Sequence, residues 1–264
     1  MAYISPKFEH AIERPNAIAL AMQEVQWTRL TEVANNLSAS HVPGFKATCL
    51  KTEEHSQKRP HLSTRSVSYT KPGDQIRLMR DGTFRQTDHP FDVALSGPGF
   101  LAVQTPNGIR YTRCGQLTLN EAQEIVTAVG GYPVLSQDQG KMTCSSHPKN
   151  VLITRDGYVI VPAEENKGGG NQSETVGRIG TFEFKSPNHL KNEGHCLLSS
   201  KEEAIPSLNT VITQHGLEDS NVSPMEESIR MIEILRLFEN AQKVIDEYDQ
   251  IRKKTINASS RNAI

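Results

Sequence analysis

The stretch that decides the fold lies near the C-terminus and reads SPMEESIRMIEILRLFENAQKVIDEYDQIRKK over residues 223–254. Its first four residues form a capping box with proline at the first helical position, which satisfies N–H groups that the start of a helix leaves without partners. Apolar residues then follow at alternating spacings of three and four, the a/d pattern of a coiled-coil helix: Met231, Ile234, Phe238, Ala241, Ile245 and Tyr248. The stretch therefore predicts one long amphipathic helix.

A second helical pattern lies near the N-terminus, from about residue 16 to residue 39. Its apolar positions recur seven residues apart, with further ones three residues later: Leu20, Trp27, Ala34, Leu30 and Leu37. We expect the two terminal helices to pair as an α-helical coiled-coil domain. The C-terminal apolar face is wider than two helices can cover, so we expect other subunits to supply the remaining helices. A helical hairpin packed on the β domain of the same chain is the alternative.

The residues between the two helices change character twice. Residues 48–88 are polar and have no sustained period, which predicts an extended linker. After them, apolar stretches flank short turn sequences, which predicts hairpins that join 100–104 to 109–113, 124–128 to 132–135, and 151–154 to 158–161. Strands that close this often, without helices between them, are typical of an antiparallel sandwich or barrel.

The predicted fold class is therefore α+β and multidomain: N- and C-terminal helices pairing as an α-helical coiled-coil domain, and a central antiparallel all-β domain. The expected segments are an N-terminal extension (1–15), the N-terminal helix of the coiled-coil domain (16–47), an extended linker (48–88), the central β domain (89–208) and the C-terminal helix (209–264).

Composition excludes several classes of protein. The 264 residues contain 29 Lys and Arg against 30 Asp and Glu, a net charge of −1, so no global field attracts nucleic acid or an acidic membrane. The longest apolar run spans 17–22, whereas a membrane-spanning helix needs about twenty residues. The start of the chain lacks the apolar region of a secretory signal peptide, so we expect any export to use another route.

The cysteines and histidines predict no catalytic or metal site. Free thiols are expected, because the cysteines have no zinc-ligand spacing and are sparse for a disulfide scaffold: Cys49, Cys114, Cys144 and Cys196. Neighbouring residues of a strand point to opposite faces, so His195 and Cys196 do not form a nucleophile–base pair. Cys144 and His147 supply two ligands, whereas a closed zinc site needs four. We expect no catalytic residue, cofactor, metal, nucleic acid or small-molecule substrate.

Three groups of motifs resemble the flagellar rod/hook family of axial proteins. They are ANNL (34–37) with PGFK (43–46), the central DVA (92–94), QTPNG (104–108) and YTR (111–113), and LEDSNV (217–222) with Pro224 and RMIE (230–233). The motifs occur in the family's order, and the resemblance covers about residues 16 to 255. Pro98, Cys114 and Asp219 depart from the pattern. The motif positions that we carry over from the family are Asn35, Asn36, Gly44, Phe45, Lys46, Ser220, Asn221, Val222 and Pro224.

The resemblance implies a non-enzymatic structural subunit of the bacterial flagellar basal-body rod, self-assembling through its terminal helices into the drive shaft that transmits torque for motility. The implied partners are other rod proteins and the flagellar type III export apparatus, and the implied location is the periplasm-spanning rod. The proximal rod member is nearest. The distal rod member or another hook or rod axial protein is the alternative, and a β-domain enzyme with helical oligomerisation ends is a further one. We expect assembly contacts at Leu20, Trp27, Leu30, Leu37, Met231, Ile234, Phe238, Ile245 and Tyr248.

Overall fold

The computed structural model describes residues 6–57, 67–144, 151–161, 174–187, 190–194 and 196–261. The chain forms two compact units, and each consists of segments that are distant in the sequence. The helical unit comprises Met1–Leu37, Thr48–Ile76 and Ser223–Ile264, and the β unit comprises Ser38–Ala47 and Arg77–Val222. Residues 1–5 of the predicted extension, and also His147 and His195, lie outside the described residues.

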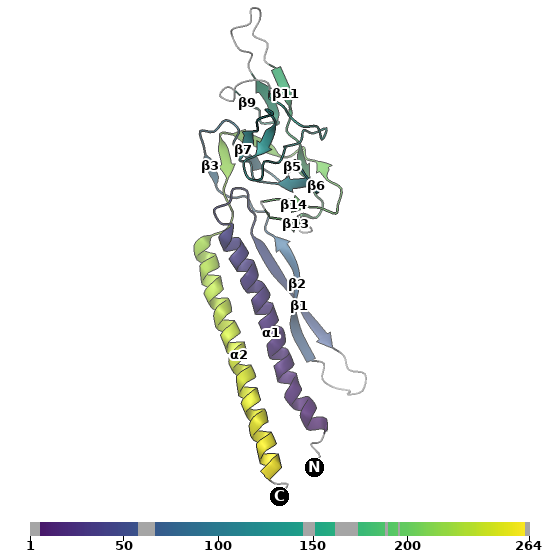
Figure 1. The fold of residues 1–264 in the computed structure, drawn as a ribbon, viewed down its shortest axis with the longest axis vertical. Coiled ribbons are helices and arrows are strands. Elements are labelled where there is room, and N and C mark those ends of the chain that lie inside the picture. Colours follow the sequence, from purple (N-terminus) through teal and green to yellow (C-terminus); the bar gives the residue numbers. More distant parts are fainter. Residues whose placement is uncertain are drawn as a thin grey trace, which may run out of the picture. The chain divides into compact units, whose positions relative to one another are not determined.

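The helical unit contains two long helices and a two-stranded ribbon (Figure 1). The helices are α1 (Pro6–Ser38) and α2 (Pro224–Arg261), and the ribbon pairs β1 (Thr48–Gln57) with β2 (Val67–Arg77). Ser223 caps α2, since the backbone N–H of Glu226 donates to its hydroxyl oxygen at 3.5 Å and Pro224 is the first helical residue. The helix α1 begins ten residues before the expected start at residue 16. The ribbon occupies much of the segment that was expected to be a linker.

The predicted fold class is wrong. The described residues form a mostly β structure with seventeen strands and two helices, one N-terminal and one C-terminal, and they give no coiled-coil pair. In α1 the predicted seam faces outward, because Leu20 is 56% exposed and Trp27 is 62% exposed. The buried side of α1 instead carries a mixture of small apolar and polar residues, which an apolar heptad does not contain: Ala19, Val25, Gln26, Glu32, Val33 and Asn36.

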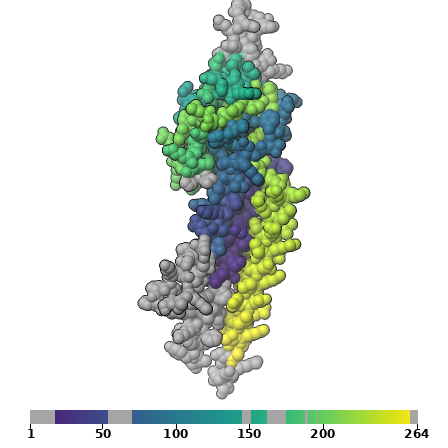
Figure 2. Space-filling view, turned by 180° about the vertical axis from the view of Figure 1, so that it is seen from behind, coloured from purple at the N-terminus to yellow at the C-terminus, as the bar shows by residue number. Residues whose placement is uncertain are grey.

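The helix α2 is buried along a narrower line than its sequence suggests. Ile234 and Ala241 are buried, while many of its other apolar side chains remain in solvent. Figure 2 shows α2, in yellow, uncovered along one face of the molecule. The apolar surface that the sequence predicted to be shared is therefore still exposed in a single chain.

The β unit is a set of short strands joined by turns, and every strand pair for which the register is defined is antiparallel. A six-stranded sheet has the order β13-β14-β6-β5-β12-β15, and a three-stranded sheet has the order β11-β10-β9. The remaining pairs are β16-β4, β17-β3 and β7-β8. The bounds are β3 (Phe84–Gln86), β4 (Val93–Ser96), β5 (Phe100–Thr105), β6 (Gly108–Thr112), β7 (Leu117–Leu119), β8 (Ile125–Thr127), β9 (Leu152–Ile153), β10 (Tyr158–Val161), β11 (Glu174–Arg178), β12 (Thr181–Glu183), β13 (Lys191–Asn192), β14 (Leu198–Ser199), β15 (Ile205–Pro206), β16 (Val211–Gln214) and β17 (Gly216–Glu218).

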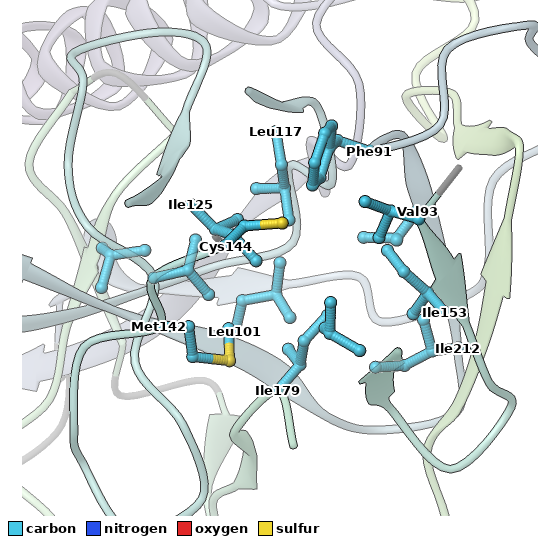
Figure 3. Packing of buried hydrophobic residues seen from close by; sticks show 14 of the residues in the cluster. Phe91, Val93, Leu101, Leu117, Ile125, Met142, Cys144, Ile153, Ile179 and Ile212 are labelled. Carbon is cyan, nitrogen blue, oxygen red and sulfur yellow. The ribbon is translucent and has the colours of Figure 1, made fainter. Parts of the chain in front are cut away.

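One apolar core lies between the sheets of the β unit. Figure 3 shows its side chains pointing toward one another from several strands, among them Leu101 of β5, Ile125 of β8, Ile153 of β9 and Ile212 of β16. A second cluster gathers around Phe100 and Phe184. Fully burying each such side chain contributes roughly 1.5–3 kcal/mol to the free energy of unfolding, so the β unit has enough core to hold a fixed framework.

Two buried polar side chains fasten α1 to β1 in the helical unit. The Asn36 amide nitrogen donates to the Thr48 carbonyl oxygen at 2.9 Å, and its amide oxygen accepts from the Thr48 N–H at 3.0 Å. One turn earlier, a carboxylate oxygen of Glu32 accepts from the Leu50 N–H at 2.9 Å. The two side chains of α1 thus bond to backbone groups at the edge of β1, which would otherwise lack partners. This explains why Asn36 and Glu32 lie on the buried face of the helix.

The environment of Glu32 gives it an unusual protonation behaviour. Burial raises the pKa of Glu32 from 4.5 to about 7, with a smaller contribution from the nearby Glu227 carboxylate, while the Leu50 hydrogen bond acts in the opposite direction. The folded chain keeps this proton up to about pH 7, whereas the unfolded chain releases it near pH 4.5. Ionisation of Glu32 therefore opposes folding within this pH window.

We predict that the helical unit loses stability as the pH rises from about 5 to about 8, and that Glu32→Gln removes part of this loss. The glutamine keeps an oxygen that accepts from Leu50 and has no charge to bury. Urea unfolding of the full chain, followed by circular dichroism at the helix band, measures the effect at both pH values. Glu24→Gln is the matched control, because Glu24 is exposed on the same helix. An unchanged pH dependence in Glu32→Gln would contradict the assignment.

Candidate functional site

The motif after α1 and the motif before α2 meet inside the β unit. The Lys46 ammonium nitrogen lies 2.5 Å from a carboxylate oxygen of Glu218, and both side chains are buried, with 2% and 6% exposed. The same ammonium donates to the Arg80 carbonyl oxygen at 2.8 Å. Strand β17, which pairs with β3, places Glu218 at this point. We call this set of contacts, together with Arg113 and Asn221, the motif junction.

Arg113 supplies a second buried positive charge to the motif junction. One of its terminal nitrogens lies 3.4 Å from the other oxygen of Glu218 and 3.4 Å from an oxygen of Asp81. Other nitrogens of the guanidinium donate to the carbonyl oxygens of Gly97 and Gly99. The guanidinium carbon lies over the Phe100 ring, 5.3 Å from the ring centre. Two cations therefore face two carboxylates, an arrangement that compensates the cost of removing charge from water.

Burial decides the electrostatics of Lys46. It lowers the pKa of Lys46, and the nearby Arg113 charge acts in the same direction, whereas the hydrogen bond and the charge of Glu218 oppose the decrease. Glu218 is held in place by a further bond, because it accepts from the Gly82 N–H at 2.8 Å. The ammonium depends on Glu218 for its charge to remain favourable.

Asn221 joins the motif junction through both ends of its side-chain amide. The amide oxygen accepts from the Ala47 N–H at 2.7 Å, and the amide nitrogen donates to the carbonyl oxygens of Leu78 and Arg80 at 2.8 and 2.9 Å. Asparagine alone among residues of this size offers an acceptor and two donors in one plane, since aspartate has no donors. The side chain therefore connects three backbone segments of the β unit.

Gly44 is required by its backbone conformation and by its neighbour. Its φ angle is +70°, and a Cβ at this position would lie 2.2 Å from the Arg113 carbonyl oxygen. The N–H of Gly44 donates to the Glu218 carbonyl oxygen at 2.6 Å. A larger residue would collide with the Arg113 backbone, so the glycine allows the segment after α1 to lie directly against it.

The structure distributes the nine motif positions over both units. Gly44, Lys46 and Asn221 converge in the motif junction, with Phe45 half-buried beside them, whereas Asn36 bonds to Thr48 in the helical unit. Asn35 and Pro224 are exposed, the Ser220 hydroxyl accepts from the Val222 N–H at 3.3 Å, and Val222 is buried. Sequence reasoning did not single out Arg113, Glu218 or Asp81. Arg113 and Glu218 stand inside quoted motifs, and a lysine in one motif opposite a glutamate in another was a usable indication.

The nine predicted assembly positions fall into three classes of exposure. Leu20 and Trp27 are exposed and Ile234 is buried. The others are half-buried: Leu30, Leu37, Met231, Phe238, Ile245 and Tyr248. A role for these residues in assembly stays a prediction.

The described part of the chain holds no cluster of three or more His, Cys, Asp or Glu side chains that could bind a metal ion. Neither of its helices is long and apolar enough to cross a membrane. The charged groups of Lys46, Glu218 and Arg113 are buried and each contacts another protein group, so these contacts hold chain segments together.

We predict that Lys46→Met lowers the free energy of unfolding by about 3–5 kcal/mol, because it removes the closest cation of a buried carboxylate. Glu218→Gln should cost a similar amount, because it leaves the buried Lys46 and Arg113 without the carboxylate that they share. Urea unfolding of the full chain measures both variants.

The matched control is Arg85→Ala, which breaks the exposed Arg85–Asp219 pair at 3.0 Å. Exposed pairs contribute up to about 1 kcal/mol, so this variant should stay near the wild type. Equal losses for Lys46→Met and Arg85→Ala would show that the buried pair has no special weight.

Comparison with known proteins places these features in a family. A family model described as "Flagellar hook protein FlgE/F/G D1 domain" matches residues 94–161, which include Arg113. A second model, "Flagellar basal body rod FlgEFG protein C-terminal", matches residues 213–258, which include Glu218 and Asn221.

Several curated proteins are similar over most of the chain. The flagellar basal-body rod protein FlgF of Caulobacter vibrioides is 28% identical over 90% of this chain and 95% of its own length. The rod protein FlgG of the same species is 30% identical over 70% of this chain and 71% of its own length. The hook-basal body complex protein FlhP of Bacillus subtilis is 26% identical over 84% of this chain and 91% of its own length. The motif order, the motif junction and these similarities lead to one conclusion: the chain belongs to the family of flagellar basal-body rod proteins.

Proposed function

We propose that this chain is a FlgF-like structural subunit of the flagellar rod whose exposed helical apolar surface binds neighbouring rod subunits. Family membership supports a structural protein of the flagellar basal body that assembles with other rod and hook-basal-body proteins. The proposal adds three points to family membership. They are an entirely non-enzymatic role, self-assembly into the shaft that transmits torque, and export through the flagellar type III apparatus. The motif junction supports a structural role, because the buried charges of Lys46, Glu218 and Arg113 bond to other groups of the β unit.

The observation that carries the proposal is the apolar surface of the two helices. In the helical unit, large apolar side chains remain exposed along α1 and α2: Leu20, Met22, Trp27, Met225, Ile229, Ile232, Leu235, Leu237, Val244, Ile251 and Ile256. In the monomer these side chains contribute less to the free energy of unfolding than the roughly 1.5–3 kcal/mol that each would contribute if it were fully buried. Exposed apolar surface on this scale marks a protein–protein interface.

The half-buried positions Met231, Phe238, Ile245 and Tyr248 border this surface on α2. Residues three or four apart lie on the same side of a helix, and Tyr248 stands four residues after Val244 and three before Ile251. A subunit that covers the exposed residues would therefore also reach the half-buried ones. The proposal thus retains all nine assembly positions, as contact residues or as the layer beneath them.

The distal rod protein is the second candidate, because the FlgG of Caulobacter vibrioides is 30% identical to this chain. Deleting the gene in its host and imaging isolated basal bodies separates the two. A FlgF-like subunit predicts a structure that stops in the proximal part of the rod. A rod that is truncated only at its distal part would favour the FlgG-like alternative.

We predict that Leu237→Asp combined with Val244→Asp abolishes incorporation into basal bodies and swimming in soft agar. Both side chains are exposed in the monomer, so charge there prevents burial against a neighbour and leaves the fold unchanged. The assay is complementation of the deletion strain, with urea unfolding of the purified variant as the test of folding.

Asn240→Asp combined with Gln250→Asp is the matched control, since both residues are exposed on the same helix and the two substitutions add the same two charges without removing a large apolar side chain. It should restore swimming. Normal incorporation of the Leu237→Asp, Val244→Asp variant would remove the helical surface from the proposal.

A further inference from the structure

Two cysteines of the β unit, Cys114 and Cys196, are neighbours in space although they are far apart in the sequence. Cys114 follows Arg113 in the segment between β6 and β7, and Cys196 lies in the turn between β13 and β14. Strand β14 pairs with β6 in antiparallel direction through Leu198 and Tyr111. Residues before Leu198 therefore lie opposite residues after Tyr111, which brings the turn to Cys114. The largest influence on the pKa of each thiol is the other thiol, which places the two side chains beside each other.

Both cysteines are held by contacts of their own backbone. The turn around Cys196 is closed by hydrogen bonds from the Leu197 N–H to Gly194 O at 2.8 Å and from the Glu193 N–H to Leu197 O at 2.9 Å. Its φ angle of 60° is unusual for a residue other than glycine. On the other side, the Cys114 N–H donates to the Thr112 hydroxyl oxygen at 3.0 Å. These bonds fix the backbone of the Cys196 turn and of Cys114.

The turn is also tied to β6 by charge. The Arg110 guanidinium lies 2.5 Å from a carboxylate oxygen of Glu193, and Arg110 belongs to β6. Cys196 is half-buried and Cys114 is buried. Cys196 is therefore the more accessible residue of the pair.

The hydrogen bond changes the acidity of the pair. The hydrogen bond with Cys196 lowers the pKa of Cys114 to about 7, while the same bond raises the pKa of Cys196. Because the two groups are coupled, the pair behaves as two sulfurs that share one proton near neutral pH. A thiolate is the form that attacks a disulfide, so the pair has one reactive sulfur under ordinary conditions.

We propose that Cys114 and Cys196 are a redox-active pair that forms an intramolecular disulfide when a disulfide oxidant reaches the half-buried Cys196. Neither Cys114 nor Cys196 forms a disulfide in the structure, which therefore shows the reduced form of the pair. The proposal concerns the β unit and does not depend on the proposed function.

The oxidation proceeds in two exchange steps that balance. The Cys114 thiolate takes the proton of the Cys196 thiol as the Cys196 sulfur attacks one sulfur of an oxidant RS–SR. The S–S bond of the oxidant breaks and RS⁻ leaves, taking up a proton from water. Cys114 then loses its proton and its thiolate attacks Cys196 Sγ, expelling the second RS⁻, which is protonated in turn. Starting from one thiol and one thiolate, the pair thus loses two electrons and one proton, and the oxidant becomes two RSH because water supplies the second proton.

The disulfide would join the β13–β14 turn to the residue directly after Arg113. It would restrict the segment that carries the buried guanidinium of the motif junction, and would close a long loop of the unfolded chain. Both effects favour the folded β unit.

The test uses the full chain carrying Cys49→Ser and Cys144→Ala, which removes the two other thiols. The protein is incubated with oxidised glutathione, denatured, treated with N-ethylmaleimide and weighed by mass spectrometry. We expect a mass lower by two hydrogens, no maleimide, and a peptide pair linking residues 114 and 196 that separates on reduction. The oxidised protein should unfold several degrees higher than the reduced one.

Adding Cys114→Ser or Cys196→Ser to this background gives the matched controls. Each should keep one maleimide or one glutathione and show no rise in the unfolding temperature with oxidant. Peptide mapping of the wild-type chain after the same oxidation repeats the test with all four cysteines present, should Cys144→Ala fail to fold. Two maleimides, two glutathiones or a disulfide-linked dimer in place of the internal bond would overturn the proposal.

Discussion

The buried ion pair between Lys46 and Glu218 is the constraint on which the rest of the β unit depends. A charge that has left water needs its partner at short range, and these two residues come from segments near opposite ends of the chain. A shift of either segment by one residue would leave the ammonium or the carboxylate alone. The pair therefore fixes the register of β17 against β3 and the path of the residues that follow α1. Arg113 and Asn221 extend the same constraint to the centre of the chain.

The helical unit follows a related rule with the opposite distribution of polarity. Its buried contacts between α1 and β1 are made by Asn36 and Glu32, while large apolar side chains such as Trp27 lie outside. In a protein that functions as a monomer, the large apolar side chains would be expected inside and the polar ones outside. A rod subunit benefits from the observed arrangement, because polar bonds keep one chain together and the apolar surface remains available for neighbours.

The sequence predicted the features that depend on local letters. The hairpin around Pro106 is confirmed as β5 and β6, because a proline and a glycine at fixed positions are enough to specify a turn. The hairpins at 151–161 and 124–135 are likewise confirmed. The family also followed from the motifs, since their order along the chain is specific.

Features that depend on distant partners were missed. Apolar periodicity cannot indicate that Glu32 and Asn36 are buried, because their burial is compensated by backbone groups of Thr48 and Leu50. Because apolar periodicity does not detect such polar contacts, the predicted fold class was wrong and the β1–β2 ribbon, whose strands carry mostly polar residues, was missed. In the motif junction, the motif glycine, lysine and asparagine were marked, but their charged partners became visible only in three dimensions.

The span of the Lys46–Glu218 contact has a consequence for when the β unit completes itself. The two residues are 172 positions apart, and α2 is all that remains of the described chain after Glu218 and its neighbouring motif. A ribosome must therefore make most of the polypeptide before the two charges can meet, and bringing such distant segments together makes folding slow. The contacts of the motif junction are consequently absent during most of the synthesis, which leaves time for cellular machinery that handles unfolded polypeptides to engage the chain first.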